Sequence, residues 1–437
     1  MDNDPREMLA RGPMSRMQIL VVAVTVGLTA LDGFDVLAIS FAAPGIARDW
    51  GIDRAALGVV LSMELVGMAA GSVLIGVLAD RIGRRRTILG CAAVMAVGMA
   101  MAGRARGLYE LSAWRVFTGL GIGGIVAACN AVAAEFSSAR RRDLCVSLMA
   151  IGYPLGAIAG GAVVVVLLRH GNWRAVFEFG AIVTAVFIPI VYAWVPESIA
   201  WLCQKRPPRA LEAVNRGLAR LGYPRVATLP PVSARPLAKG GTPDIFRPEL
   251  ARTTILLSLT YFLQITTFYF IVKWIPKIVV DMGFAPSVAA GVLVWTNVGG
   301  ATGGALLGLL TQRLDVKRLT LVLLVGSAAL VAIFGHSQPN LWQLSLVCAA
   351  SGFCANGAIV GVFAVMARAF PTMLRATGTG FAIGVGRAGA VLAPIAAGVL
   401  FEAGYGLQTV AVAMSVGSLG AAVCLALVAL EPAAPGS

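Results

Sequence analysis

Apolar residues fill long blocks of the chain, and short polar segments separate these blocks. A helix needs about 20 consecutive apolar residues to cross the hydrocarbon core of a bilayer. Strands of a membrane barrel need about half that length, and lipid does not tolerate an open sheet edge. We therefore predict an all-α integral membrane protein with twelve transmembrane helices, at approximately residues 17–41, 55–79, 87–102, 109–133, 144–168, 174–195, 253–275, 286–310, 318–335, 341–366, 374–398 and 406–430.

The composition of the 437-residue chain agrees with this pattern, since 58% of its residues are hydrophobic and only 13% are charged. The mean hydropathy is +0.84, whereas a soluble domain carries about 25% charged residues. The 51 glycines also fit a helical membrane protein, because small residues allow membrane helices to pack closely.

The blocks divide six and six around a long segment that is rich in Pro and Arg. This division predicts an N-terminal six-helix half, 1–195, a cytoplasmic linker, 196–252, and a C-terminal six-helix half, 253–437. Within the linker, residues 209–221 have the pattern of a short amphipathic helix at the membrane surface. Two six-helix repeats with a central site are typical of a carrier that exposes its site to each side in turn.

The net charge of +14 would favour nucleic-acid binding only if the basic residues shared one surface. Of the 35 Lys and Arg residues, three lie within apolar blocks, seven in the loops opposite the N-terminus, and the rest on the N-terminal side. The positive-inside rule then places both termini in the cytoplasm. We interpret the basic excess as a topology signal and expect no nucleic-acid partner. Lys273, near one end of its block, is expected to reach the membrane interface.

Two aspartates, Asp32 and Asp35, interrupt the first apolar block. Residues at i and i+3 share one face of a helix, and a carboxylate at the bilayer centre costs several kcal/mol. An ion or substrate pathway is therefore the expected reason for them. Burial raises the pKa of a carboxyl group, a nearby arginine lowers it, and a close pair titrates as a unit. We hypothesise that the two aspartates take up a proton on one side of the membrane and release it on the other.

Two more charged residues lie inside apolar blocks, Glu64 in the second and Arg115 in the fourth. We expect Arg115 to pair with the two aspartates and to set their proton affinity. The alternatives are a structural ion pair between the first and fourth helices, and snorkelling of Arg115 to the interface. Glu64 belongs either to the proton route or to an ion pair with an arginine, and both readings stay open.

Arg387 lies at the middle of the eleventh block, too deep to reach water. A guanidinium group binds a carboxylate through two parallel N–H groups, so we expect Arg387 to hold an anionic substrate. The alternative is a permanent ion pair with another helix. Aromatic residues in membrane helices more often pack or anchor than bind ligands. With that reservation, the candidate walls of the substrate site are Tyr153, Tyr261, Gln264, Trp295, Asn297 and Asn356.

Residues 76–85 have the form G-x-x-x-D-R-x-G-R-R and resemble the signature loop of the major facilitator superfamily. Residues 115–121, with the form R-x-x-x-G-x-G, match a second pattern of that superfamily. The resemblance implies the major facilitator fold and a conformational latch at this loop. Positive-inside charge alone does not explain the spacing of its Asp and Gly residues. The expected latch residues are Asp80, Arg81, Gly83, Arg84 and Glu135.

The D-G-x-D segment 32–35 and the G-V-G-R-A-G-A segment 384–390 are similar to motifs of the aromatic acid:proton symporter family. This resemblance implies proton-coupled uptake of an aromatic or small organic acid across the bacterial inner membrane. Its partners would be a small organic anion, protons and the lipid bilayer. Residues 196–202 resemble the P-E-S-x-x-x-L element of sugar porters. A sugar or dicarboxylate proton symporter therefore remains an alternative, as does a membrane sensor that binds without transporting.

Signatures of catalysis, ATP binding and metal binding are missing from the sequence. We therefore do not expect an enzyme, and we expect a monomer that needs no cofactor and no metal. Six of the seven cysteines lie inside apolar blocks, and Cys203 falls in the linker. Disulfides are not expected in a reducing compartment.

Overall fold

The computed structural model describes residues 4–231, 242–311, 313–371 and 374–429. Twelve helices in these ranges are long and apolar enough to cross a membrane, and the ranges contain no strand. The predicted all-α architecture with twelve transmembrane helices is confirmed.

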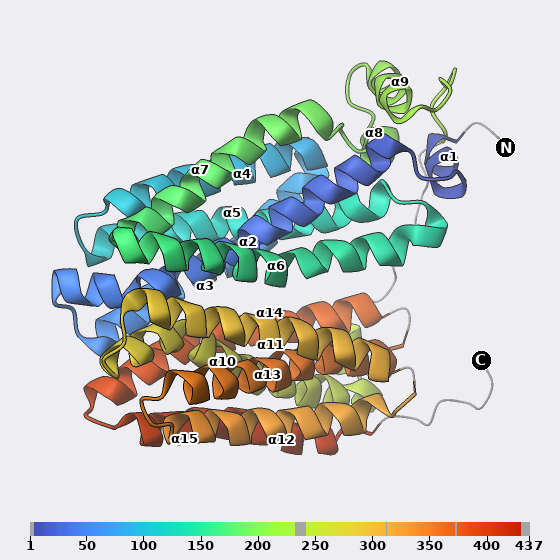
Figure 1. Ribbon diagram of the computed structural model, residues 1–437. Helices are drawn as coiled ribbons and strands as arrows, with labels where there is room; N and C mark the ends of the chain where they lie inside the picture. The colour runs from blue at the N-terminus through green and yellow to red at the C-terminus, as the bar shows by residue number, and fades with distance from the viewer. Residues whose placement is uncertain (1–3, 232–241, 312, 372–373, 430–437) are drawn as a thin grey trace. The chain divides into compact units, whose positions relative to one another are not determined.

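The first of two compact units comprises Met1–Ala38, Met63–Gly160 and Gly171–Ala234. Figure 1 shows its short helices α1, α8 and α9 at one end of the longer ones. The helices that contribute to this unit are α1 (Pro5–Arg11), α2 (Arg16–Trp50), α3 (Arg54–Ile82), α4 (Arg84–Arg104), α5 (Leu108–Glu135), η1 (Ala139–Arg141), α6 (Arg142–His170), α7 (Arg174–Trp194), α8 (Ile199–Lys205) and α9 (Ala210–Leu221).

The second unit comprises Ile39–Ser62, Gly161–His170 and Arg235–Ser437. It therefore takes the distal ends of α2, α3 and α6, which are the ends opposite the N-terminus. Its other helices run side by side in Figure 1. They are η2 (Thr242–Phe246), α10 (Pro248–Asp281), α11 (Pro286–Leu310), α12 (Val316–Gly335), α13 (Leu341–Ala369), α14 (Arg375–Glu402) and α15 (Leu407–Ala426).

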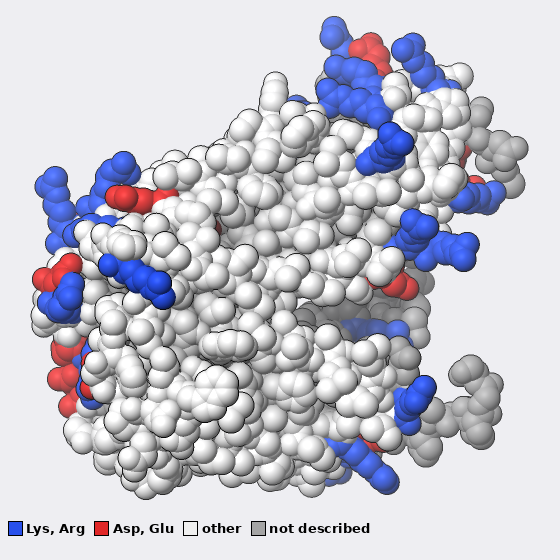
Figure 2. Space-filling view, in the orientation of Figure 1, with Lys and Arg blue, Asp and Glu red and all other residues white. Residues whose placement is uncertain are grey.

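The charged side chains lie mainly at the helix ends, whereas the lengths between are uncharged on the face drawn in Figure 2. Several helices continue beyond the apolar blocks into these charged ends. The first block ends near residue 41, but α2 extends to Trp50 through Arg48 and Asp49. The apolar pattern marks the part of a helix that lipid surrounds, and a helix can continue past it into water.

Helices α2 and α6 approach each other closely through glycine. A Cβ atom on Gly33 would lie 2.0 Å from the carbonyl oxygen of Tyr153, and one on Gly156 would lie 1.7 Å from that of Ala30. Small residues at such positions let membrane helices pack backbone to backbone. The glycine of the D-G-x-D segment therefore fixes the distance between α2 and α6, and with it the position of the two aspartates.

The predicted amphipathic helix at 209–221 is confirmed as α9. It buries an apolar face that includes Val214 and Leu218, and Gly222 ends it in a left-handed conformation with φ of +82°. The predicted linker also contains α8, which the sequence pattern did not indicate. Ser198 caps α8 by accepting a hydrogen bond from the Trp201 amide, and Cys203 is 1% exposed inside this helix.

Hydrogen bonds between helices hold the interior of the second unit. The Gln264 amide in α10 donates to the Ala355 carbonyl in α13 at 3.1 Å and accepts from Ser418 in α15 at 2.7 Å. Thr267 donates to the Met414 carbonyl at 2.7 Å. Polar residues inside a membrane bundle stabilise helix packing in this way.

Candidate functional site

The predicted acidic residues and Arg115 are buried together in the first unit. Helix α2 carries Asp32 and Asp35, α3 carries Glu64, and α5 carries Arg115. Asp32 is 3% exposed, and the other three side chains are fully buried. Four ionisable groups from three helices are thus buried in the interior of the first unit.

Arg115 forms an ion pair with Glu64, and it donates from Nη2 to the backbone carbonyl of Asp35 at 3.0 Å. Its guanidinium also lies 5.4 Å from the centre of the Phe177 ring. Arg115 therefore links α5 to α2 and α3 from a fully buried position. Snorkelling of Arg115 to the interface, the alternative raised above, is wrong because its side chain has no exposed surface.

Asp35 has a different environment from Glu64. Within the described residues, neither of its carboxyl oxygens has a hydrogen-bond partner. The Arg115 bond goes to the backbone of Asp35 rather than to its carboxyl group. The Oδ1 atom lies 3.2 Å from the position of a Cβ on Gly180, so the carboxyl group faces α7. An ionised carboxyl group in an apolar site is costly unless it is paired and hydrogen-bonded.

Arg387 lies half-buried on α14 in the second unit. No ion pair or hydrogen bond with Arg387 is present in the part of the chain that the structure describes. The Tyr261 ring packs against the preceding residue, since a Cβ on Gly386 would lie 2.1 Å from Tyr261 Cδ1. Tyr261 also contacts Phe363, with ring centres 5.3 Å apart. The Tyr261 ring thus lies beside the backbone that carries Arg387, and Phe363 packs against that ring.

The other candidate wall residues differ in what surrounds them. Gln264 is fully buried and uses its amide for the interhelical bonds described above. Asn356 donates to the Gly300 carbonyl at 2.7 Å, and Asn297 to the Leu293 carbonyl at 2.8 Å. Tyr153 is half-buried on α6, and Trp295 is 53% exposed on α11. Among the members of this set in the second unit, Tyr261 is the one with a contact to the described segment that carries Arg387.

Lys273 does not reach the membrane interface as predicted. Its side chain is fully buried in α10. Helix α10 continues for eight residues beyond it to Asp281, so Lys273 lies more than two turns inside the helix rather than near its end.

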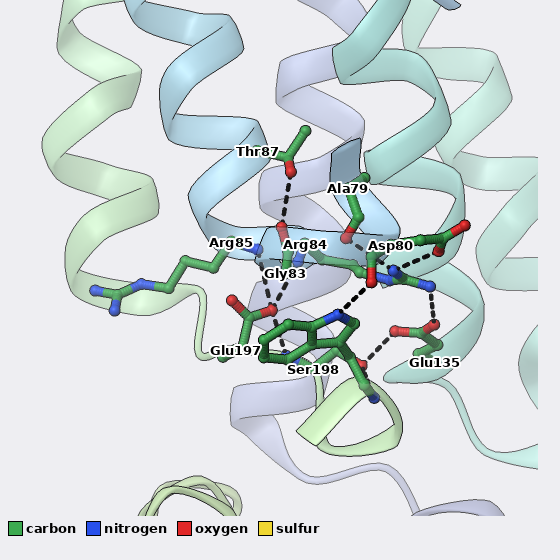
Figure 3. A network of polar contacts seen from close by, with 10 residues as sticks. Ala79, Asp80, Gly83, Arg84, Arg85, Thr87, Glu135, Glu197 and Ser198 are labelled. Carbon is green, nitrogen blue, oxygen red and sulfur yellow. Dashed lines mark hydrogen bonds and ion pairs between the residues drawn. The ribbon is translucent and has the colours of Figure 1, made fainter. Parts of the chain in front are cut away.

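The signature loop between α3 and α4 forms a network of polar contacts around Arg84 (Figure 3). The Arg84 guanidinium pairs with Asp80 at 2.7 Å and with Glu135 at 3.4 Å. It also donates to the Ala79 carbonyl at 3.0 Å. Arg81 is exposed and lies outside these contacts. The loop is thereby tied to the end of α5 within the first unit.

Glu197 and Ser198, which follow α7, complete this network (Figure 3). Glu197 Oε1 accepts from the backbone amides of Arg84 at 2.8 Å and Arg85 at 3.2 Å. Ser198 donates to Glu135, and the Trp201 indole donates to the Asp80 carbonyl at 3.0 Å.

Gly83 adopts φ of +105° in this loop, and a Cβ there would lie 2.3 Å from Glu197 Oε2. A side chain at this position would therefore collide with the Glu197 carboxylate, which accepts the hydrogen bonds from Arg84 and Arg85. The backbone amides that Glu197 binds are not visible in a pattern of side chains.

A second charged cluster, at the distal end of the second unit, was not predicted as a site. Arg54 pairs with Asp281 at 3.2 Å, and its backbone amide donates to Glu402 at 3.1 Å. Lys277 pairs with the same Asp281. The Arg54 guanidinium lies 5.3 Å from the centre of the Phe401 ring and lines a cavity of about 200 Å³. The only sequence signal was the i, i+4 spacing of Lys277 and Asp281.

Groups of His, Cys, Asp or Glu that could hold a metal ion are missing from the described ranges.

The chain belongs to the major facilitator superfamily. The model of that family, described as Major Facilitator Superfamily, matches residues 25–313 and 257–437. In fold, the chain is similar to the inward-open xylose transporter XylE from E. coli, with a TM-score of 0.73, 17% identity, and coverage of 95% of this chain and 97% of that one. At this identity the likeness concerns the fold alone.

Among members of the superfamily, the chain is similar to transporters of aromatic acids. The chain is 28% identical to a gallate transporter of Pseudomonas putida, over 97% of this chain and 94% of that protein. It is 30% identical to a 3-(3-hydroxy-phenyl)propionate transporter of Escherichia coli (strain K12), over 96% of each. The resemblance to the aromatic acid:proton symporter family is confirmed by these relatives.

Proposed function

We propose that this protein imports an aromatic or small organic acid across the bacterial inner membrane together with protons, by alternating access. The observation that carries this proposal is similarity over nearly the whole chain to transporters of gallate and of 3-(3-hydroxy-phenyl)propionate. Buried acids in α2 and a buried ion pair next to them supply a physical basis for proton coupling.

In this proposal Asp35 is the main proton carrier, and Asp32 acts with it. A buried carboxyl group without hydrogen-bond partners exchanges a proton when water reaches it from one side, and it loses that proton when its surroundings change. The Arg115–Glu64 pair already balances its own charge. The guanidinium therefore holds the α2 backbone at Asp35 without neutralising its carboxyl group permanently.

Arg387 is the proposed binding group for the substrate carboxylate. Its guanidinium can form two parallel hydrogen bonds with a carboxylate, and the lack of an acidic partner among the described residues supports this role. Tyr261 would contact the ring of an aromatic acid, since aromatic pairs favour edge-to-face or offset stacking. Tyr153 and Trp295 stay predicted contacts. Gln264, Asn297 and Asn356 are better explained by the hydrogen bonds that they already form.

We further propose that the network around Arg84 is the conformational latch. Four segments meet there, and several of the contacts are charge-assisted hydrogen bonds, which are stronger than neutral ones. A movement that separates α8 from the loop between α3 and α4 would break several of them together. We place both termini in the cytoplasm on the positive-inside distribution, and we expect a monomer without a cofactor.

The test is uptake into proteoliposomes that contain the purified protein. Labelled benzoate, 4-hydroxybenzoate, gallate, muconate and glucose are supplied with an inward proton gradient, with and without an uncoupler. We expect uptake of one or more acids that the uncoupler abolishes, and no uptake of glucose. Proton-driven glucose uptake would instead identify a sugar porter, and binding of an acid without counterflow would identify a sensor.

A further inference from the structure

A large groove lies in the first unit between α9 and the ends of α4 and α7. Its volume is about 990 Å³. Four arginines line it, and basic side chains gather over α8 and α9 in Figure 2. The four are Arg85, Arg216, Arg220 and Arg225.

The fold preorganises this groove. The segment after α9 turns at Gly222 and runs back along the helix, where Asn215 binds the backbone of Val226 twice. The Asn215 amide donates to the Val226 carbonyl at 3.0 Å, and the Val226 amide donates to Asn215 Oδ1 at 2.8 Å. These bonds hold the neighbouring Arg225 close to α9, which carries Arg216 and Arg220 one turn apart on one face.

The protein balances the positive charge of the groove only in part. Two acids also line it, Glu197 and Glu212. Glu197 already accepts hydrogen bonds from three backbone amides through Oε1. Over the ranges that the structure covers, no ion pair involves Arg216, Arg220 or Arg225. Like charges one turn apart on a helix repel each other, so an anion bound between them would stabilise this arrangement.

The groove lies where a membrane surface is expected. Helix α7 ends at Trp194, and Tyr192 and Trp194 are 66% and 45% exposed. Aromatic residues of this kind are enriched at the level of lipid head groups. Arg85 lies 4.9 Å from the centre of the Tyr192 ring, at the wall of the groove. Ile182 and Val186, farther along α7, are 64% and 52% exposed and present apolar surface.

We propose that this groove binds the head group of an anionic phospholipid from the adjoining leaflet. Arg216, Arg220 and Arg225 bind the phosphate, and the exposed apolar residues of α7 contact the acyl chains. Basic pockets beside transmembrane helices bind anionic lipid head groups through this combination of charge and apolar contact. Inorganic phosphate would leave most of the groove empty and would make no use of the apolar surface. The site is independent of which solute the protein transports.

The test is native mass spectrometry on the full-length protein in detergent, with added phosphatidylglycerol, phosphatidylcholine or sn-glycerol 3-phosphate. The variant is Arg216→Gln/Arg220→Gln/Arg225→Gln. Its matched control is Arg140→Gln/Arg141→Gln, which removes two exposed arginines of η1 outside the groove. We expect phosphatidylglycerol affinity to fall about fivefold for each groove arginine removed. The control should match the wild type, and phosphatidylcholine binding should be equal in all three.

Arg225→Gln alone keeps the test decisive if the triple variant unfolds, because Arg225 lies in a loop and is exposed. A triple variant with Lys in place of Gln should retain most of the affinity, since the charge is kept. Unchanged phosphatidylglycerol binding by the folded Gln variants would overturn the proposal. Equally tight binding of sn-glycerol 3-phosphate would also overturn it, because the acyl chains would then play no part.

Discussion

The Cβ position of Gly33 lies 2.0 Å from the carbonyl oxygen of Tyr153. Gly33 lies between the two aspartates of α2. The close approach of α2 to α6 at this residue therefore helps to fix the positions of both carboxyl groups. The backbone of α6 cannot move aside as a flexible side chain would. Gly33 therefore helps to position Asp32 and Asp35.

We expect Gly33→Ala to lower stability by about 1–3 kcal/mol, the usual cost of overpacking a tight interface, and to reduce uptake strongly. The measurements are thermal unfolding in detergent and initial uptake rates. The control is Gly90→Ala in α4, where a Cβ would meet nothing within 4 Å and Ala should slightly favour the helix. Equal uptake by the wild type and Gly33→Ala would contradict the role assigned to this contact.

Asp35→Asn should abolish gradient-driven uptake while the protein remains in the membrane. The amide has the same shape but carries no exchangeable charge, so coupling is lost and substrate exchange survives. Uptake under a proton gradient and counterflow without one separate these two effects. Asp143→Asn is the control, because Asp143 is exposed at the start of α6. Normal pH-dependent uptake by Asp35→Asn would disprove the proposed proton route.

Glu64→Gln should destabilise the protein by about 3–5 kcal/mol, because it leaves the Arg115 charge buried without its partner. Combining it with Arg115→Met should restore part of the loss, because the double variant buries no unpaired charge. The thermal unfolding of the two single variants and the double variant gives the interaction energy. Additive losses would show that the two residues act independently.

Arg387→Lys should raise the KM for an acid at least tenfold, which corresponds to about 1.4 kcal/mol. Lysine keeps the charge but cannot form two parallel hydrogen bonds with a carboxylate. Initial rates over a range of substrate concentrations give KM, and Arg368→Lys, an exposed position at the end of α13, is the control. An unchanged KM would remove Arg387 from the substrate site.

The Cys203 thiol should resist alkylation at neutral pH. Burial raises its pKa to about 11, and the thiolate is the form that reacts. The reactive form is therefore scarce below pH 11 and increases as the pH rises. Maleimide labelling followed by mass spectrometry of the peptide measures this rate. Gln204→Cys, at the exposed neighbouring position, should react rapidly, and equal rates at the two positions would contradict the burial of Cys203.

The sequence was sufficient for the fold because apolar block length directly reflects bilayer thickness. It also identified Asp32, Asp35 and Arg115 as buried charges, since each interrupts an apolar block. It favoured the two aspartates as partners of Arg115 and did not single out Glu64, which forms the ion pair with Arg115 in the structure. Glu64 lies 51 positions away in the chain, as its numbering shows, and only the packing of α3 against α5 brings the two together.

Residue type alone does not show which polar side chains bind a neighbouring helix. Gln264 and Asn356 looked like possible walls of a binding site because they are polar and lie within apolar blocks. In the structure both bind carbonyl groups of neighbouring helices. The contacts of Glu197 escaped prediction for a related reason, since its partners are backbone amides, which every residue except proline carries.

The second unit takes residues 39–62 and 161–170 from the first half of the chain. Severing the polypeptide within 242–252 would therefore leave the first unit whole but would yield a C-terminal fragment that lacks part of the second unit. That fragment would lack the hairpin formed by the ends of α2 and α3, which supplies Arg54. Asp281 would then lose its guanidinium partner. During synthesis, this hairpin is made before α10 and α14, so the second unit can be completed only after α14 has been translated.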